Sequence, residues 1–352
     1  MKLLRILLLP FSLLYGCIVW VRNKLYDGHF ISVKHFDLPI ISVGNLSAGG
    51  TGKSPHVEYL IRLLNEKHTL ATLSRGYGRS TEGFIISSST SKATEIGDEP
   101  RQFKSKFPDI TVAVDAKRVN GITQLLTISP PIHVVILDDA FQHRSVMPGL
   151  SILLTDYNKL YCDDVMLPSG TLREFKCGAK RADIIIVTKC PNQISNQSRQ
   201  QIIQKLHTLQ HQKIYFSFIQ YGHLVAVNKK NIVSETALTT DTTVVLLTGI
   251  ANPKPMADYL TPRVKTIVPA RFADHHEFNQ KDITSVLNIF NTIASDKKII
   301  VTTEKDWMRL ESSDFANQLL NLPLFYLPIE IDFSETDKQT FNNQISEYVK
   351  RN

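Results

Sequence analysis

The sequence predicts an α/β protein in which helices cover both faces of a mostly parallel sheet. Over about the first 220 residues, short apolar runs alternate with segments whose apolar residues recur at helical spacing, which is the pattern of parallel strands joined by helices. A glycine-rich segment ending in Gly-Lys-Ser stands between one such strand and one such helix. Beyond residue 220 the pattern changes, which predicts a smaller α/β second lobe.

The glycine-rich segment runs from Asn45 to Ser54, after the apolar run 38–43 and before a helical pattern over 56–64. Strand, glycine-rich loop, Gly-Lys-Ser and helix form the arrangement of a phosphate-binding loop (P-loop), as in P-loop NTPases. Glycines let successive N–H groups point to one place, and the helix N-terminus adds partial positive charge. We expect a nucleotide site at Ser47, Ala48, Gly49, Gly50, Thr51, Gly52, Lys53 and Ser54.

Within this loop, Lys53 would reach the outer phosphates and the Ser54 hydroxyl would ligate Mg²⁺. Ser47 stands where the usual spacing has glycine. The alternative interpretation is a glycine-rich turn that carries Gly-Lys-Ser by chance. The expected strand and helix on either side favour the phosphate loop and a nucleoside triphosphate.

Composition narrows the classes of function. The chain has 352 residues and a formal charge of +7, which suits an anionic membrane surface or a phosphorylated substrate. No run of Lys and Arg is interleaved with aromatic residues, so nucleic acid is not indicated. Cys17, Cys162, Cys177 and Cys190 form no Cys-x-x-Cys pair, so neither a zinc site nor a redox motif is indicated.

The N-terminal segment, residues 1–24, is rich in apolar residues. Its uninterrupted apolar part, from Ile6 to Val21, is shorter than the roughly 20 residues that a membrane-spanning helix prefers. A signal peptide, a buried core helix and a helix lying on the membrane surface are the three alternatives. We favour the membrane surface, with Trp20 near the headgroups and basic residues on anionic lipid: Lys2, Arg5, Arg22 and Lys24.

The pattern along the chain gives a domain organisation. We expect a membrane-anchoring helix over 1–24, a P-loop core over 25–218, a hairpin linker over 219–236 and a C-terminal lobe over 237–352. A closing helix over 332–350 ends that lobe and could pack back on the core. Expected strands lie at 38–43, 68–74, 110–114, 133–137, 150–155, 182–189, 244–249, 298–302 and 324–327.

Two pairs of neighbouring acidic residues are candidates for the site. Asp138 and Asp139 end an apolar strand, where phosphate-loop proteins place a carboxylate that holds Mg²⁺ directly or through water. The alternative is an acidic strand end that caps the next turn. Asp98 and Glu99 precede Pro100 at the start of a helix, and the helix dipole alone would explain both. Spacing therefore leaves a catalytic role for them open.

Two further segments could take part in chemistry. Arg173 follows a turn-rich loop and could stabilise charge on a transferred phosphoryl group, or it could be an exposed salt-bridging arginine. Asp274-His275-His276 could orient an imidazole for proton transfer, or could be a polar surface loop. Residues 302–306 could close on the nucleotide or start a capped helix.

Together these pieces resemble the tetraacyldisaccharide 4'-kinase (lipid A 4'-kinase) family. The matching segments run in the family's order over nearly the whole chain, and the Asp-Asp-Ala-Phe-Gln-His and Gly-Asp-Glu-Pro pieces are more specific than the phosphate loop. They are 43–46, 49–54, 74–77, 97–100, 138–144, 167–170, 172–174, 274–278 and 303–306.

The resemblance implies an ATP-dependent phosphotransferase with Mg²⁺ that acts on the 4'-hydroxyl of a tetraacylated glucosamine disaccharide 1-phosphate. It implies that Asp98 accepts the hydroxyl proton and that a histidine of the Asp-His-His segment pairs with it. We assign this histidine as His275 over His276, because the Asp-His step is the firmer part of the motif.

The same resemblance assigns the remaining site residues. Glu99, Asp138 and Asp139 would manage Mg²⁺ and its waters, together with Ser54. Arg173 and Lys53 would steady the phosphates. Tyr77 and Gln142 would line the site near the nucleotide or the sugar.

The resemblance also implies partners and a location. The expected partners are a lipid A disaccharide precursor and the lipid surface at the cytoplasmic face of the inner membrane, with no nucleic acid, for a monomeric protein. A membrane-tethered nucleotide switch and a small-molecule P-loop kinase are the alternative functions.

Overall fold

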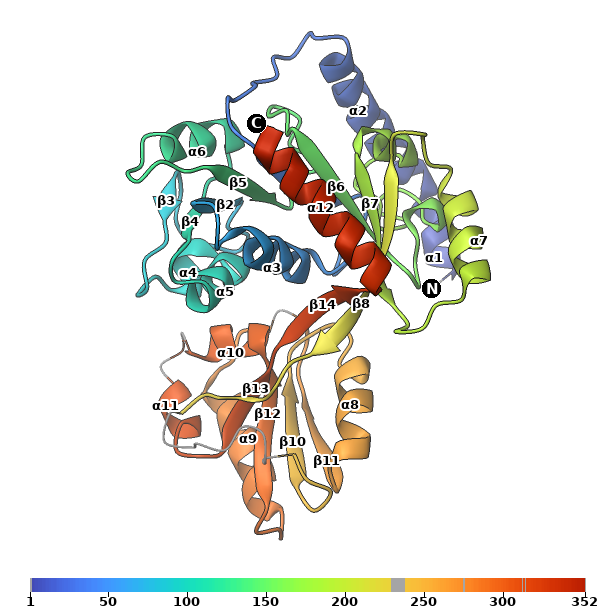
Figure 1. Cartoon of the computed structure of the whole chain (residues 1–352). Helices are drawn as coiled ribbons and strands as arrows, with labels where there is room; N and C mark the ends of the chain where they lie inside the picture. Colours follow the sequence, from blue (N-terminus) through green and yellow to red (C-terminus); the bar gives the residue numbers. More distant parts are fainter. Residues whose placement is uncertain (1, 229–237, 275, 312, 314, 352) are drawn as a thin grey trace.

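The computed structural model describes residues 2–228, 238–274, 276–311, 313 and 315–351. The chain forms two lobes, each built around one sheet (Figure 1). Within the described residues, the sheet of the larger lobe has nine strands and that of the smaller lobe has five. The predicted α/β class with mostly parallel sheets is confirmed.

The strand that leads into the glycine-rich loop, β1 (Ile40–Asn45), lies at the centre of the larger sheet. Neighbouring strands are parallel except at the two edges, where β14 pairs with β8 and β3 pairs with β4 in antiparallel fashion. Central strands such as β1 are buried throughout because helices cover both faces. The order across the sheet is β14 (Ile329–Phe333), β8 (Lys213–Tyr221), β7 (Ile184–Cys190), β6 (Leu150–Asp156), β1 (Ile40–Asn45), β5 (Val134–Asp138), β2 (Leu70–Ser74), β4 (Thr111–Val114) and β3 (Ile85–Ile86).

Helices cover both faces of this sheet, as the sequence predicts. Apolar residues of α3 (Lys53–Leu64), α5 (Asp98–Lys106) and α12 (Glu335–Arg351) share one core with one face. The opposite face packs on α6 (Arg118–Leu125), α7 (Asn196–Leu206) and the short helices η1 (Tyr161–Asp163) and η2 (Lys176–Arg181). The four-residue helix α4 (Ala93–Ile96) leads into α5.

The smaller lobe has its own core on each side of a sheet. Its strands, in spatial order, are β11 (Thr266–Arg271), β10 (Thr243–Thr248), β12 (Lys298–Thr303), β13 (Leu324–Leu327) and β9 (Val225–Ala226). One face packs on α9 (Gln280–Thr292), α10 (Glu304–Glu311) and α11 (Ala316–Leu319), and the other on α8 (Lys254–Leu260), which η3 (Thr261–Arg263) follows.

The chain enters the smaller lobe after β8 and returns to the larger lobe with β14. Phe341, Ile345 and Val349 of α12 then pack in the larger core. The closing helix thus packs back on the core, as the sequence allowed. The expected bounds of the C-terminal lobe, 237–352, are corrected, because β14 joins the larger sheet as well. The closing helix also begins at Glu335 and not at 332, since alternating apolar and polar residues make 329–333 an edge strand.

The expected hairpin linker is described only in part. Val225–Ala226 pairs with β13 in antiparallel fashion, so this part of the linker belongs to the smaller sheet. Residues 229–237, which hold the expected turn and return strand, lie outside the described residues.

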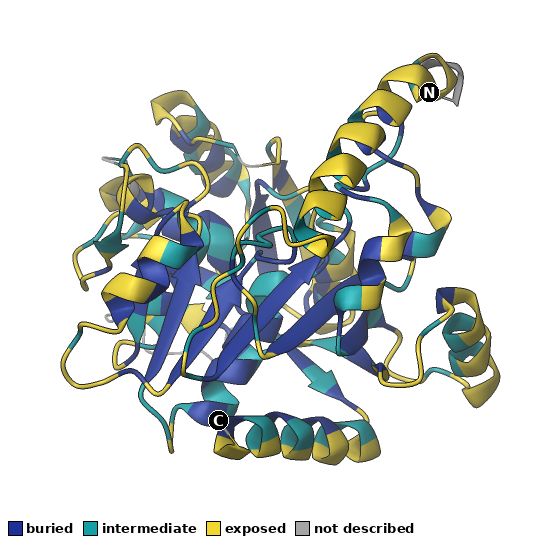
Figure 2. Cartoon of the chain, turned by 90° about the horizontal axis from the view of Figure 1, so that it is seen from above, coloured by how far each residue is buried: buried dark blue, intermediate teal, exposed yellow. Residues whose placement is uncertain are grey.

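At the N-terminus, α1 (Lys2–Leu7) is followed by α2 (Leu9–Asp27). Figure 2 shows this segment extending from the edge of the larger lobe with most of its surface exposed. Within the part of the chain that the structure describes, no helix combines the length and the hydropathy needed to cross a membrane.

Candidate functional site

The glycine-rich loop connects the central strand β1 to the N-terminus of α3. Gly52 caps the helix with φ of 84°, a left-handed conformation that favours glycine. Asn45, the last residue of β1, donates a hydrogen bond from Nδ2 to Thr51 Oγ1 at 2.7 Å. The loop therefore lies at the carboxyl ends of the strands, where ligands bind in sheets of this kind, with Lys53 as the first helical residue.

A second segment runs antiparallel to the loop and supports it. The Ala48 N–H donates to Thr171 O at 2.6 Å, and the Arg173 N–H donates to Leu46 O at 2.7 Å. Ser47 and Leu172 form the bridge between these two bonds. The backbone that carries Arg173 and the backbone of the phosphate loop are thus hydrogen-bonded to each other directly.

Lys53, Asp139 and Arg173 meet beside this loop. Asp139 Oδ2 lies 3.6 Å from Lys53 Nζ, and Asp139 Oδ1 lies 2.8 Å from Arg173 Nη1. Burial acts to raise the pKa of Asp139, but Lys53 and Arg173 outweigh it and hold this pKa below the usual range. The structure therefore gathers two cations around one carboxylate where a triphosphate would lie.

Asp138 has a different environment although it is the preceding residue. Its Oδ2 accepts a hydrogen bond from Ser74 Oγ at 3.3 Å, while Oδ1 is buried and has no hydrogen-bond partner among the described residues. Burial, with the nearby carboxylates of Asp139 and Glu99, raises the pKa of Asp138 to about 7. A buried carboxylate oxygen without a hydrogen-bond partner is costly unless a ligand completes it.

These donors suit Mg²⁺ bound together with phosphate oxygens. Among the described residues, no three His, Cys, Asp or Glu side chains are grouped closely enough to hold a metal ion by themselves. Magnesium normally uses one or two carboxylates and completes its shell with phosphates and water. The orphaned Asp138 oxygen, Asp139 and the Ser54 hydroxyl fit that pattern.

Asp98 and Glu99 begin α5 and face helix α10 of the smaller lobe. Asp98 Oδ2 accepts from Arg309 Nε at 2.7 Å, and Glu99 Oε1 accepts from Lys305 Nζ at 2.8 Å. Arg309 was not among the residues predicted from the sequence. Its four-residue spacing from Lys305 places both cations on one face of a helix, which is the signal that could have found it.

Lys189 is a second residue that sequence reasoning did not connect with the site. It lies on β7, and its ammonium group contacts Gly50 O of the phosphate loop. The same group lies 2.7 Å from Asp156 Oδ2 at the end of β6. Its position near the carboxyl end of a strand in a parallel sheet was the available signal.

The Asp-His-His segment is described only in part. His275 lies outside the described residues. His276 Nε2 lies 2.8 Å from Asp282 Oδ2 on α9, and its ring stacks on Phe272 at a centroid distance of 5.0 Å. His276 is therefore held within the smaller lobe.

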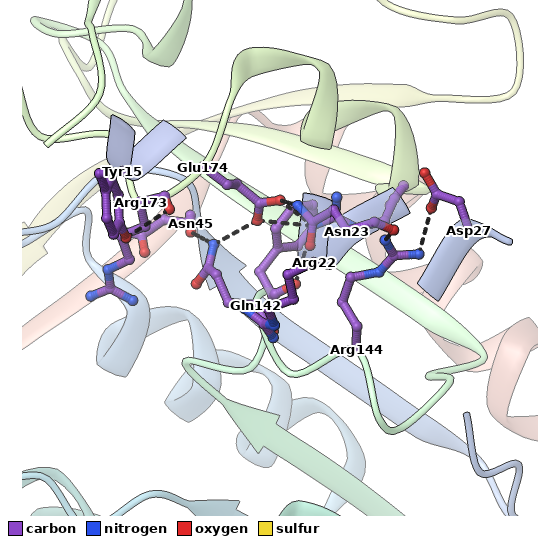
Figure 3. Close-up of polar contacts among 11 residues, drawn as sticks. Tyr15, Arg22, Asn23, Asp27, Asn45, Gln142, Arg144, Arg173 and Glu174 are labelled. Atoms are coloured by element: carbon purple, nitrogen blue, oxygen red, sulfur yellow. Dashed lines mark hydrogen bonds and ion pairs between the residues drawn. The ribbon is translucent and has the colours of Figure 1, made fainter. Parts of the chain in front are cut away.

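The remaining predicted residues differ in how they are held. Tyr77 is exposed in the loop after β2. Gln142 donates from Nε2 to Asn45 O and to Glu174 Oε1, both at 2.9 Å (Figure 3). In the segment 302–306, Thr303 Oγ1 accepts from the Asp306 N–H at 3.0 Å, which is the capped helix start that the sequence analysis considered.

Comparison with known proteins gives a consistent result. A family model for tetraacyldisaccharide-1-P 4'-kinase matches residues 4–350. The chain is similar to the tetraacyldisaccharide 4'-kinases of Flavobacterium johnsoniae and Bacteroides thetaiotaomicron, at 47% and 46% identity. These matches cover 100% and 98% of this chain and 99% and 93% of the relatives.

The fold also has a solved counterpart. LpxK from Aquifex aeolicus, in a crystal structure with ATP, matches with a TM-score of 0.75 and 28% identity over 98% of this chain and 99% of that one. With the family model and the relatives spanning the chain nearly from end to end, this protein belongs to the tetraacyldisaccharide-1-P 4'-kinase family.

Proposed function

We propose that this chain transfers the γ-phosphoryl group of ATP to the 4'-hydroxyl of a tetraacylated glucosamine disaccharide 1-phosphate, in lipid A biosynthesis. Membership of the kinase family supports the reaction. The observation that carries the site is the contact of Lys53 and Arg173 with Asp139 beside a phosphate loop at the N-terminus of α3.

In this reaction the 4'-oxygen forms a bond to the γ-phosphorus while the bond from that phosphorus to the bridging oxygen breaks. ADP leaves with the electron pair. The N–H groups of residues 47–54 and Lys53 bind the phosphates, and Arg173 neutralises charge on the transferred group. Asp138, Asp139, Glu99 and Ser54 would hold Mg²⁺, which supplies charge neutralisation between the phosphates when bound.

The hydroxyl proton passes to Asp98, and His275 pairs with Asp98 to assist this transfer. The contact of His276 with Asp282 and Phe272 supports His275 as the active histidine, because His276 is already engaged inside the smaller lobe. Asp98 and the histidine come from different lobes. Approach of the lobes about the junction near residue 220 would bring them together and exclude water.

We further propose that α2 rests on the lipid surface at the cytoplasmic face of the inner membrane. An outer stripe of α2, formed by Phe11, Leu14, Ile18, Val21 and Leu25, recurs at intervals of three and four residues and is exposed. A contiguous apolar stripe of this kind favours an interface with lipid. Trp20, also exposed, suits the headgroup region.

The test is ATP consumption by the purified protein in detergent, with and without a tetraacylated disaccharide 1-phosphate, followed by product mass. Acceptor-dependent gain of one phosphoryl group, lost in Lys53→Ala and reduced at least 100-fold in Asp98→Ala, is expected. Slow ATP hydrolysis at the same rate with and without acceptor would overturn the proposal in favour of a nucleotide switch. Turnover of Asp98→Ala within a few-fold of wild type would remove Asp98 as the base.

A further inference from the structure

Helix α2 presents an inner stripe to the larger lobe that is distinct from its apolar outer stripe. The inner stripe consists of Ser12, Tyr15, Gly16 and Asn23, and all four contact the segment 169–175, which includes Arg173. Ser12 and Gly16 are buried, whereas residues of the outer stripe such as Ile18 are 62% exposed. One helix thus has an exposed apolar side and a side joined to the site.

The inner contacts are specific and polar. Tyr15 Oη donates to Arg173 O at 3.0 Å, and Asn23 Nδ2 donates to Glu174 Oε2 at 2.9 Å (Figure 3). Ser12 Oγ accepts from the Ser169 N–H at 2.9 Å. The two residues Tyr15 and Asn23 therefore hold the consecutive residues Arg173 and Glu174 from two points on α2.

Close packing reinforces these hydrogen bonds. A Cβ atom added at Gly16 would lie 2.6 Å from Cζ of Phe175, closer than carbon atoms can approach. Glycine at this position lets α2 lie directly against the segment. The helix is consequently fixed by packing between its two hydrogen-bonding residues.

Glu174 is the centre of this arrangement. Its side chain is 1% exposed and accepts hydrogen bonds from Asn23, from Gln142 Nε2 and from Arg181 Nη2 at 2.9 Å each. Gln142 also donates to Asn45 O at the end of β1. Arg181 Nη2 also donates to Glu174 Oε2 at 2.9 Å. A buried carboxylate needs its donors, and removing Asn23 leaves Arg181 to hold Glu174 Oε2 beside Arg173.

The segment that α2 holds is the one that supports the phosphate loop. Arg173 contacts Asp139 through its side chain and Leu46 through its N–H, and Thr171 accepts from Ala48. A displacement of the segment therefore moves a phosphate-binding cation and the loop backbone together. In phosphoryl transfer, a misplacement of about 1 Å can cost about 100-fold in rate.

We propose that Tyr15 and Asn23 are positioning residues for phosphoryl transfer, through which α2 fixes Arg173 and the phosphate loop. This inference rests on the proposed function of the same site. It separates two properties of one helix: the inner stripe sets the rate of the reaction, and the outer stripe sets attachment to lipid.

The test compares Tyr15→Phe and Asn23→Leu with Tyr26→Phe, a matched control on the same helix. The Tyr26 hydroxyl makes no hydrogen bond to the described part of the chain, and its ring packs on Arg22 and Arg144, which phenylalanine preserves. Each variant is assayed in detergent at saturating acceptor and ATP. We expect kcat to fall about 10-fold in Tyr15→Phe and Asn23→Leu, with the control within two-fold of wild type.

Two further measurements separate positioning from a general structural effect. In an Arg173→Lys background, Tyr15→Phe should cost less than two-fold, because the residue it positions is already altered. Flotation with vesicles of phosphatidylethanolamine and phosphatidylglycerol should be unchanged in the inner variants and reduced in Ile18→Ser. Equal cost of Tyr15→Phe in both backgrounds, or kcat equal to wild type, would overturn the inference.

Affinity for a fluorescent ATP analogue, measured without acceptor, keeps this inference separate from the proposed function. If wild-type protein fails to phosphorylate the acceptor, the proposed function fails. The inner variants should still weaken nucleotide binding about five-fold relative to Tyr26→Phe, because the phosphate loop is hydrogen-bonded to the segment they hold. Unchanged nucleotide affinity in that case would overturn the inference as well.

Discussion

Arg309 Nε lies 2.7 Å from Asp98 Oδ2, so a cation of the smaller lobe holds the carboxylate that we propose as the base. Asp98 lies on α5 of the larger lobe and Arg309 lies on α10 of the smaller lobe. Arg309 Nη1 also lies 3.3 Å from Asp306 Oδ1 on its own helix. Because Asp306 and Asp98 both contact the Arg309 guanidinium group, this group fixes the orientation of the Asp98 carboxylate.

Replacing Arg309 by methionine should therefore lower kcat by about 10- to 100-fold, with a smaller change in the KM for ATP, since the carboxylate loses its orienting partner. Steady-state kinetics in detergent provide the measurement. Arg101→Met is the control, because Arg101 pairs with Glu311 between the same two helices at 3.2 Å. An equal loss in both variants would attribute the effect to the contact between helices.

Lys106 should be important for stability. Its ammonium group lies 2.8 Å from Glu58 Oε2 on α3 and 3.0 Å from Glu304 Oε2 on α10, and Glu58 is fully buried. Lys106→Met leaves two buried carboxylates facing each other, and removing one partner of a buried ion pair typically costs about 3–5 kcal/mol. The free energy of unfolding in urea measures this cost.

The double variant Lys106→Met with Glu58→Gln is the control for that prediction. It removes one of the two carboxylates that Lys106 neutralises, so it should recover part of the lost stability. A double variant that is less stable than Lys106→Met would show that the loss comes from packing and not from charge.

Lys189 should contribute to nucleotide binding. Its contact with Gly50 O ties β7 to the phosphate loop, and Asp156 fixes the ammonium group at 2.7 Å. Lys189→Met frees the loop backbone, so we expect ATP affinity to fall about 10-fold by isothermal titration calorimetry. Lys180→Met, an exposed lysine on η2, should have no effect, and equal affinities in the two variants would contradict the prediction.

Two histidines make stability depend on pH. His56 is buried, with Nδ1 2.7 Å from Gly52 O and Nε2 3.0 Å from Ser217 Oγ, and burial lowers its pKa from 6.5 to about 4. Burial, with the nearby cations Arg118 and Arg75, also lowers the pKa of His143 to about 4. Between pH 6.5 and 4 the unfolded chain binds protons that the folded chain does not, so stability falls as pH falls.

Each group contributes up to about 1.4 kcal/mol per pH unit inside that window. Removing one of them in His56→Gln should make the free energy of unfolding fall less steeply between pH 7 and pH 5 than in wild type. Chemical denaturation at several pH values measures both slopes. A difference between the two proteins that stays constant with pH would contradict the assignment to His56.

Much of the larger lobe is predictable because its signals are local. An apolar run without interruption, as in 134–137, identifies a strand buried on both faces, and glycines before Lys53 identify the loop. Edge strands are harder to predict. β14 alternates isoleucine with acidic residues and merges into the following helix, and β11 contains Pro269, so neither has the pattern of a buried strand.

The parts of the site that depend on tertiary contacts could not be predicted. Asp98 stands at a helix start for which the dipole alone is a sufficient reason, and only the packing of α5 on α10 brings Arg309 to it. The inner stripe of α2 is similar. The role of Tyr15 and Asn23 depends on contacts with Arg173 and Glu174, about 150 residues later in the sequence, and a strongly apolar segment gives no local signal for these contacts.

The return of the chain to the larger lobe has a consequence for biosynthesis. Tyr348 Oη on α12 hydrogen-bonds both N and O of Ile40, the first residue of the central strand, at 2.9 and 3.1 Å. During translation these partners are separated by 308 residues, and the smaller lobe emerges from the ribosome between them. The smaller lobe can therefore fold before the larger lobe is complete, and β1, which leads into the nucleotide loop, is fully covered only after α12 has been synthesised.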